Sequence, residues 1–262
     1  MNEKIVDQII NEVMSKLGDA AAPEPAPAPK CAPCSMTEFV GTAIGNTIGL
    51  VIANVDNQLH EAMGIDKKYR SIGILGARTG AGPQLMAMDE AVKATNTEVL
   101  TIELARDTMG GAGHGSLIIV GAHDVSDARR AIEVALKELD RTFGDVYANA
   151  AGHLEFQYTA RSSYVLEKAF KAPLGKAFGL VVGGPAAIGV VISDVAVKAA
   201  NVEVLGYSSP GNGGTKFSNE VIITVTGDSG AVRQAVIAAR EAGIGLLGTL
   251  DVTPTSVTKP YI

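Results

Sequence analysis

The stretch DEAVKATNTEVL at residues 89–100 occurs a second time, slightly altered, as DVAVKAANVEVL at residues 194–205. Nine of the twelve aligned positions are identical, and the offset between the copies is 105 residues. A second match pairs VSDARRAIEVALKEL at 125–139 with DSGAVRQAVIAAREAG at 228–243, and aligns Asp124 with Asp228 at an offset of 104. Because internal repeats indicate a duplicated structural unit, we expect two copies of one domain, at residues 36–144 and 145–262.

Length and composition fit two modest domains and argue against several classes of protein. The 262 residues carry a net charge of −6 without any basic run, which disfavours a nucleic-acid partner. The most apolar run, residues 177–192, is interrupted by glycine and proline and is too short to span a membrane. Both cysteines fall in one short segment, and the N-terminus lacks the long apolar core of a secretory signal. A cytoplasmic location is therefore expected.

Apolar periodicity predicts the same order of elements in both copies. In the first copy, strands are expected at 47–53, 71–77, 98–104 and 116–121, and helices at 55–63, 82–94 and 126–139. In the second copy, strands are expected at 153–160, 177–182, 203–207 and 220–226, and helices at 164–170, 189–200 and 229–242. Two glycine-rich loops, 106–115 and 208–219, join strands directly. The expected fold class is α/β (α+β), with two tandem domains that each contain a mixed or antiparallel sheet covered by helices.

The N-terminal segment differs in composition from the rest of the chain. Residues 1–18 place apolar side chains on one face of a helix, and residues 19–35 form a linker rich in proline and alanine. Such a tethered helix is expected to dock on a partner through Ile5, Ile9, Val13 and Leu17; the alternative is packing on its own oligomer, or no structure. Cys31 and Cys34 lack the further ligands that a structural zinc site requires.

The search for catalytic patterns finds little. No nucleophile elbow, zinc-protease or Walker pattern is present, and the four histidines, His60, His114, His123 and His153, lack metal-ligand spacing and are expected at the surface or in loops. Residues 76–83, GARTGAGP, lie between a strand and a helix, so their N–H groups offer an alternative function, a nucleotide- or anion-binding sensor or enzyme. The favoured expectation is a protein without catalytic residues, cofactor or metal.

The two glycine-rich loops occupy the same place in both copies. Glycine allows close approach of backbones and exposes polar groups that can hydrogen-bond a small solute. In a ring of subunits these loops are expected to line a pore; the alternative is a mobile hairpin tip.

Several long motifs resemble the shell-protein domain of bacterial microcompartments, the BMC domain. They include AVKAANVEVLGY (196–207) and GDSGAVRQAVIAA (227–239), separated by a glycine loop. Residues 47–63 resemble an element that closes the ordinary domain but here comes first, which implies circular permutation. With TEFVGTAIG (37–45), RSIGILGARTGAGP (70–83), RDTMGGAGHGS (106–116) and LDRTFGDVYANAAGH (139–153), the chain resembles the tandem-domain shell proteins of propanediol-utilisation microcompartments and their ethanol-utilisation relatives. The N-terminal extension resembles the long form of these proteins, and Met36 falls near the start of the short form.

The resemblance implies a homotrimer whose six domains mimic a hexagon and tile into the microcompartment shell in the bacterial cytoplasm. It implies contacts with other shell proteins, docking of encapsulated enzymes through residues 1–18, and passage of small polar metabolites such as glycerol or propanediol. Lys93 and Lys198 match the lysine that the family places at tile edges. Arg161 matches an edge arginine of the family, and Asn54 stands at the equivalent position of the first copy. The implied pore residues are Arg106, Asp107, Gly110, Gly111, Gly113, His114, Ser208, Ser209, Asn212, Lys216, Ser218 and Asn219.

Overall fold

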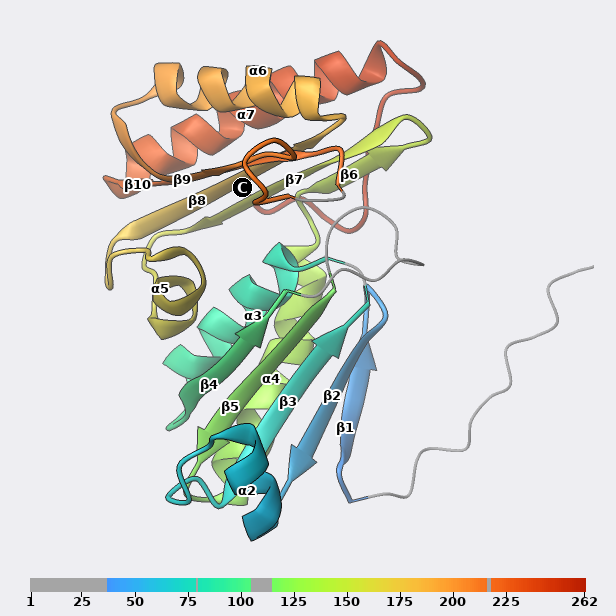
Figure 1. Cartoon of the computed structure of the whole chain (residues 1–262). Coiled ribbons are helices and arrows are strands. Elements are labelled where there is room, and N and C mark those ends of the chain that lie inside the picture. Colours follow the sequence, from blue (N-terminus) through green and yellow to red (C-terminus); the bar gives the residue numbers. More distant parts are fainter. Residues whose placement is uncertain (1–36, 79, 105–114, 216–217) are drawn as a thin grey trace, which may run out of the picture. The chain divides into compact units, whose positions relative to one another are not determined.

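The structure is a computed structural model that describes residues 37–78, 80–104, 115–215 and 218–262 (Figure 1). Residues Thr37–Ile262 form one compact unit built from two antiparallel sheets. The N-terminal helix and linker expected at residues 1–35 lie outside the described residues. None of the described helices is both long enough and apolar enough to cross a bilayer.

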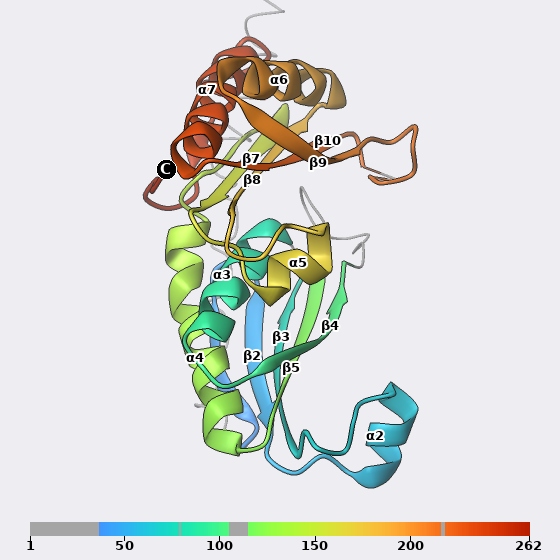
Figure 2. The ribbon, with the colours of Figure 1, turned by 90° about the vertical axis from the view of Figure 1, so that its left-hand side faces the viewer.

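The first sheet has the strand order β1-β2-β3-β5-β4, and every neighbouring pair is antiparallel. Its strands are β1 (Phe39–Ala43), β2 (Thr47–Ile52), β3 (Ser71–Ala77), β4 (Glu98–Glu103) and β5 (Ser116–Ala122). The long helix α4 (Val125–Thr142) covers one face, which we call the helix face, with α3 (Gly82–Lys93) beside α4. The short helix α2 (Asn57–Met63) lies on the opposite side of the sheet, the outer face (Figure 2).

The second sheet repeats this plan in the order β11-β6-β7-β8-β10-β9, again with antiparallel pairs throughout. Its strands are β6 (Val146–Asn149), β7 (Gly152–Thr159), β8 (Ala177–Gly184), β9 (Val202–Ser208), β10 (Val221–Gly227) and β11 (Thr255–Ser256). Helices α6 (Ala186–Ala199) and α7 (Ser229–Gly248) cover its helix face, and α5 (Tyr164–Phe170) belongs to its outer face (Figure 1).

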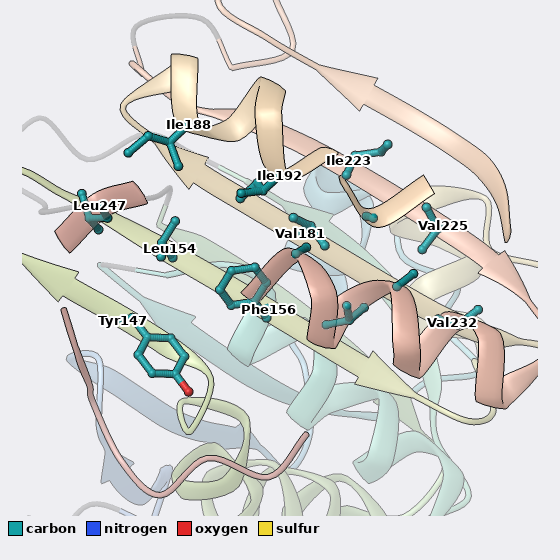
Figure 3. Close-up of a cluster of buried hydrophobic side chains, with 14 of the residues drawn as sticks. Tyr147, Leu154, Phe156, Val181, Ile188, Ile192, Ile223, Val225, Val232 and Leu247 are labelled. Atoms are coloured by element: carbon teal, nitrogen blue, oxygen red, sulfur yellow. The ribbon is translucent and has the colours of Figure 1, made fainter. Parts of the chain in front are cut away.

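Each sheet has its own apolar core beneath its helices. In the second sheet, Leu154 and Phe156 of β7 pack with Val181, Val232 and neighbouring aliphatic side chains (Figure 3). The first sheet has a matching core that includes Leu75, Ile118 and Ile132. A third cluster joins the two halves of the chain, because Met86 of α3 packs on Leu166 of α5 and Phe178 of β8.

A buried aspartate ties the C-terminus to the second sheet. Asp145 forms a 2.7 Å ion pair with Arg240 and accepts hydrogen bonds from the backbone N–H groups of Tyr261 and Ile262 at 2.8 and 3.0 Å. Arg240 also donates to the backbone oxygen of Ile262 at 2.9 Å. A buried carboxylate with several charge-assisted donors is well compensated, so this arrangement holds Tyr261 and Ile262 against the domain.

Most expected elements of the two sheets are present, with differences at their limits. Three strands were not predicted: β1, β6 and β11. Helix α6 begins at Ala186 rather than 189, and α7 continues to Gly248 rather than 242. The early start of α6 follows from a close approach, since a Cβ on Gly183 would lie 2.6 Å from the Cα of Gly189. The helix can therefore form directly after β8, close against it.

Candidate functional site

A cavity of about 400 Å³ lies on the outer face of the second sheet, where the first half of the chain approaches it. The sheet contributes side chains from β7, β8, β9 and β10, and the end of α5 closes one side. Ala81, Gly82 and Leu104 come from the first half of the chain. Ser208, Gly214 and Glu220 come from the second glycine-rich segment and its end. The cavity is therefore built by both repeats of one chain.

Four ionisable residues line this cavity: His153, Glu155, Lys171 and Glu220. His153 Nε2 lies 2.9 Å from Glu220 Oε2, and both glutamates are buried. Burial, reinforced by the negative charge of Glu220, raises the pKa of Glu155 to about 8, although a hydrogen bond from Gln157 opposes the rise. Glu155 thus retains its proton at neutral pH, and it lines the cavity as a hydrogen-bonding group without charge.

The first turn of α3 packs directly against Glu155. A Cβ on Gly82 would lie 1.7 Å from Glu155 Oε1, so any larger residue there would force the Glu155 carboxyl group to move. The contact gives a physical reason for a glycine in the sequence GARTGAGP. It also disfavours the alternative function proposed for residues 76–83, because an acidic side chain covers the turn that would receive an anion.

The structure brings part of the expected second pore loop to the cavity. Ser208 lines it, whereas Ser209 and Asn212 lie in an exposed turn held by their mutual hydrogen bonds. Asn219 accepts a hydrogen bond from the N–H of Ala186 at 3.2 Å, and Ser218 donates its backbone N–H to Thr215. The other expected pore residues lie outside the described residues: Arg106, Asp107, Gly110, Gly111, Gly113, His114 and Lys216. The expected docking residues Ile5, Ile9, Val13 and Leu17 also lie outside them.

The expected edge residues occupy unlike environments. Lys93 Nζ lies 2.8 Å from Asp89 and 2.9 Å from Glu90, with 25% of its side chain exposed. Lys198 pairs with Asp194 at 2.7 Å, but 74% of its side chain is exposed. Lys93 and Arg161 line one cavity of about 530 Å³, between the end of α3 and the turn before α5. The structure therefore joins Lys93 and Arg161 and leaves Lys198 apart.

Two of the histidine predictions were wrong. His60 is buried, and its Nε2 lies 2.9 Å from the backbone oxygen of Tyr69. His153 lines the cavity in its pair with Glu220. Within the part of the chain that the structure describes, no group of three or more His, Cys, Asp or Glu residues is arranged to hold a metal ion.

Sequence reasoning did not identify Glu155 and Glu220 as site residues. One signal for Glu155 was present in the alternation of β7. Leu154 and Phe156 point to one face of the strand, and Glu155 and Gln157 point to the other. Buried polar residues on a strand face indicate a polar environment there. Glu220 gave no comparable signal, since it lies at the end of an irregular loop.

Comparison with known proteins gives close matches along the whole chain. The family model described as "BMC domain" matches residues 71–151 and 177–255. A curated protein of Citrobacter freundii, "Bacterial microcompartment shell protein PduB", is 62% identical over 269 aligned residues, covering 100% of this chain and 99% of the relative.

Two solved structures are also similar. "Crystal structure of a trimeric bacterial microcompartment shell protein PduB" shares 54% identity with a TM-score of 0.82, covering 87% of this chain and 100% of that one. EtuB from Clostridium kluyveri shares 57% identity with a TM-score of 0.84, at the same coverages. Both family matches begin at β3 and β8, in the middle of each sheet, as a circularly permuted order of strands would give.

Proposed function

The chain belongs to the BMC-domain family of bacterial microcompartment shell proteins, and from this premise we propose that it forms a homotrimeric shell unit whose within-chain cavity conducts small polar metabolites. The family assignment confirms the resemblance inferred from the sequence motifs. It also confirms the fold class of two tandem, circularly permuted BMC domains, the location in the microcompartment shell, and the structural rather than enzymatic class.

The observation that carries the conduction proposal is the composition of the cavity wall. Its ionisable groups are a protonated glutamic acid, a histidine paired with a glutamate, and Lys171, so hydrogen-bond donors and acceptors are both present. Hydroxyl groups of a diol or triol can both donate to and accept from such groups. The wall therefore suits small neutral polar molecules, such as the propanediol and glycerol implied by the resemblance.

The assembly proposal follows from the duplication and from the relatives. A solved PduB shell protein with 54% identity is described as trimeric. Three copies of a duplicated domain make a ring with near-sixfold symmetry, which can tile a flat layer. We assign Lys198 to the outer edge of this unit because its side chain is largely exposed. Lys93 and Arg161, which line one cavity between the end of α3 and the turn before α5, are assigned to a second type of edge.

The N-terminal segment has a separate proposed role. Residues 1–18 carry an apolar face without an obvious place in a domain core, and the linker of residues 19–35 gives them reach. Docking of encapsulated enzymes through Ile5, Ile9, Val13 and Leu17 is the function that this pattern favours. Deleting residues 1–35 should leave the assembled shell intact but reduce the amount of enzyme that copurifies with it.

Blocking the cavity tests conduction directly. In Ala81→Phe, a bulky side chain would extend from the cavity wall, whereas Ala150→Phe places the same ring on an exposed turn away from the cavity. Microcompartments purified with each variant would be given external diol, and the conversion rate would be measured in intact and in broken shells. Ala81→Phe should slow conversion only in intact shells, and Ala150→Phe should not. Equal rates in intact shells of the two variants and the wild type would refute conduction through this cavity.

A further inference from the structure

The outer faces of the two sheets are covered to different extents. In β7, the outer side chains Glu155, Gln157 and Thr159 are all buried. In the matching strand β2, the outer side chains Ile48, Leu50 and Ile52 are exposed or half-buried. The second sheet is covered because α3, from the first half of the chain, lies against it, as Figure 2 shows. Among the described residues, no helix from the other half of the same chain covers the first sheet in this way.

The covering contact centres on Met86 of α3. This side chain is 1% exposed and packs with Leu166 of α5, with Ala172 and with Phe178 of β8. Beside it, Asp89 accepts hydrogen bonds from the backbone N–H and the hydroxyl of Ser163, at 3.0 and 2.6 Å. The contact thus has an apolar centre and one buried carboxylate.

The repeat places an equivalent covering surface on α6. The offset of 105 that aligns Asp89 with Asp194 also aligns Met86 with Val191. Val191 is 47% exposed, and the adjacent Val190 is exposed as well. Two neighbouring exposed valines on a helix of an otherwise well-packed domain indicate a surface that another molecule covers.

The repeat also places an equivalent receiving surface on α2. Helices α2 and α5 each have seven residues and end at a left-handed residue, Gly64 and Lys171, which fixes their offset at 107. This offset aligns Leu59 with Leu166. Leu166 is fully buried against Met86, whereas Leu59 is 39% exposed.

We propose that α6 of one chain covers α2 and the outer face of the first sheet in a second copy, and that this contact sets Asp194 of the first copy against Asp56 of the second as a carboxyl pair. The inference rests on the proposed homotrimer. The contact between α3 and α5 has an equivalent pair of surfaces, on α6 and on α2, and both are exposed on every chain. A second copy therefore supplies the surface that each of them lacks. Such a head-to-tail contact can close into a ring, as the proposed homotrimer requires.

The two contacts differ in their charged groups. At the offset of 107, Asp56 takes the place of Ser163, the residue that donates to Asp89 within the chain. The Asp56 carboxylate already accepts from the N–H of Gln58 at 2.8 Å and has no proton to donate when ionised. Lys198 pairs with Asp194 as Lys93 pairs with Asp89. The other charged neighbours are lost, because Val195 stands in the place of Glu90 and Asn54 in the place of Arg161.

The two contacts also differ where the cavity lies. Glu155 and Gly82 meet within the chain, and the same offsets place Ile48 and Ala187 at the matching positions between chains. A polar side chain facing glycine is thus exchanged for an aliphatic side chain facing alanine. The contact between chains is therefore apolar at this point, so the trimer would alternate three polar cavities with three closed apolar contacts.

Sedimentation velocity of the full 262-residue chain tests the surface. The wild type should sediment as a trimer of the 27.0 kDa chain. Val191→Glu puts a charge into the apolar contact and should raise the dissociation constant about 100-fold or more. Val252→Glu makes the same change at an exposed valine outside the surface and should leave the trimer intact. A monomeric wild type would refute the proposed trimer, whereas a trimeric Val191→Glu variant would refute this surface alone.

A double-mutant cycle tests the carboxyl pair. Asp56→Ser recreates the residue found within the chain and should tighten the trimer about tenfold near pH 7.5, but have no effect in an Asp194→Ala background. Equal effects of Asp56→Ser in both backgrounds would refute the pair.

Discussion

Replacing Gly82 by alanine adds one methyl group at the tightest contact between the two halves of the chain. The added Cβ would lie 1.7 Å from Glu155 Oε1, 2.9 Å from its carboxyl carbon, and 3.5 Å from the Cγ of Gln157. The first two distances are far inside van der Waals contact, so the glutamate must move. Glu155 is buried, and moving its carboxyl group toward the cavity would break its hydrogen bond with Gln157.

The expected cost is about 1–3 kcal/mol, the range for an extra methyl group in a well-packed site. Alanine normally stabilises a helix interior by about 0.5–1 kcal/mol relative to glycine, so the steric term must exceed that gain. The repeat supplies a compensating change. Glu155→Ile together with Gly82→Ala reproduces the pairing of Ile48 with Ala187 and should recover much of the lost stability.

Urea denaturation at one fixed protein concentration measures the effect, because oligomerisation makes the midpoint depend on concentration. Gly211→Ala is the matched control, since a Cβ there meets nothing closer than a serine hydroxyl at 3.9 Å. A midpoint for Gly82→Ala equal to or above that of Gly211→Ala would show that the two halves of the chain do not meet through this contact.

Two further predictions concern buried carboxyl groups. The folded-state pKa of Glu155, about 8, lies above its ordinary 4.5, so its contribution to stability is complete below about 4.5 and is lost as pH rises to about 8. Glu155→Gln should remove this decline, at most about 1.4 kcal/mol per pH unit, in urea midpoints compared with the wild type across that range. Asp145→Asn leaves a buried arginine without its charge partner and should cost about 3–5 kcal/mol by the same assay. Asp251→Asn, at an exposed site, should change the midpoint little; equal losses in these two variants would contradict the role given to Asp145.

The duplication and most secondary structure follow from local sequence. Periodic apolar residues and recurring glycine loops are local signals, so the sequence predicts both sheets and their helices. The short strand β1 has the sequence FVGTA, whose small residues give a weak strand pattern, and β6 follows α4 after a short connection. Both strands depend on pairing with a neighbour rather than on their own pattern.

The candidate cavity could not be predicted in this way, because it depends on contacts between distant segments. The sequence shows Glu155 on one face of a strand, but not that the first turn of α3 lies on that face. Asp89 and Asp194 are identical in the repeat, yet one is buried and the other is exposed. Their difference comes from which neighbour is present, and a single repeat does not encode that information.

The central claim is that the chain is a tile of a protein shell, and electron microscopy of the purified protein at moderate concentration tests it most directly. Trimers that meet through edges bearing exposed Lys198 should form hexagonally ordered sheets, and Lys198→Ala, which adds no carboxylate beside Asp194, should yield dispersed trimers without sheets. Dispersed monomers of the wild-type protein, with no ordered arrays, would contradict the account.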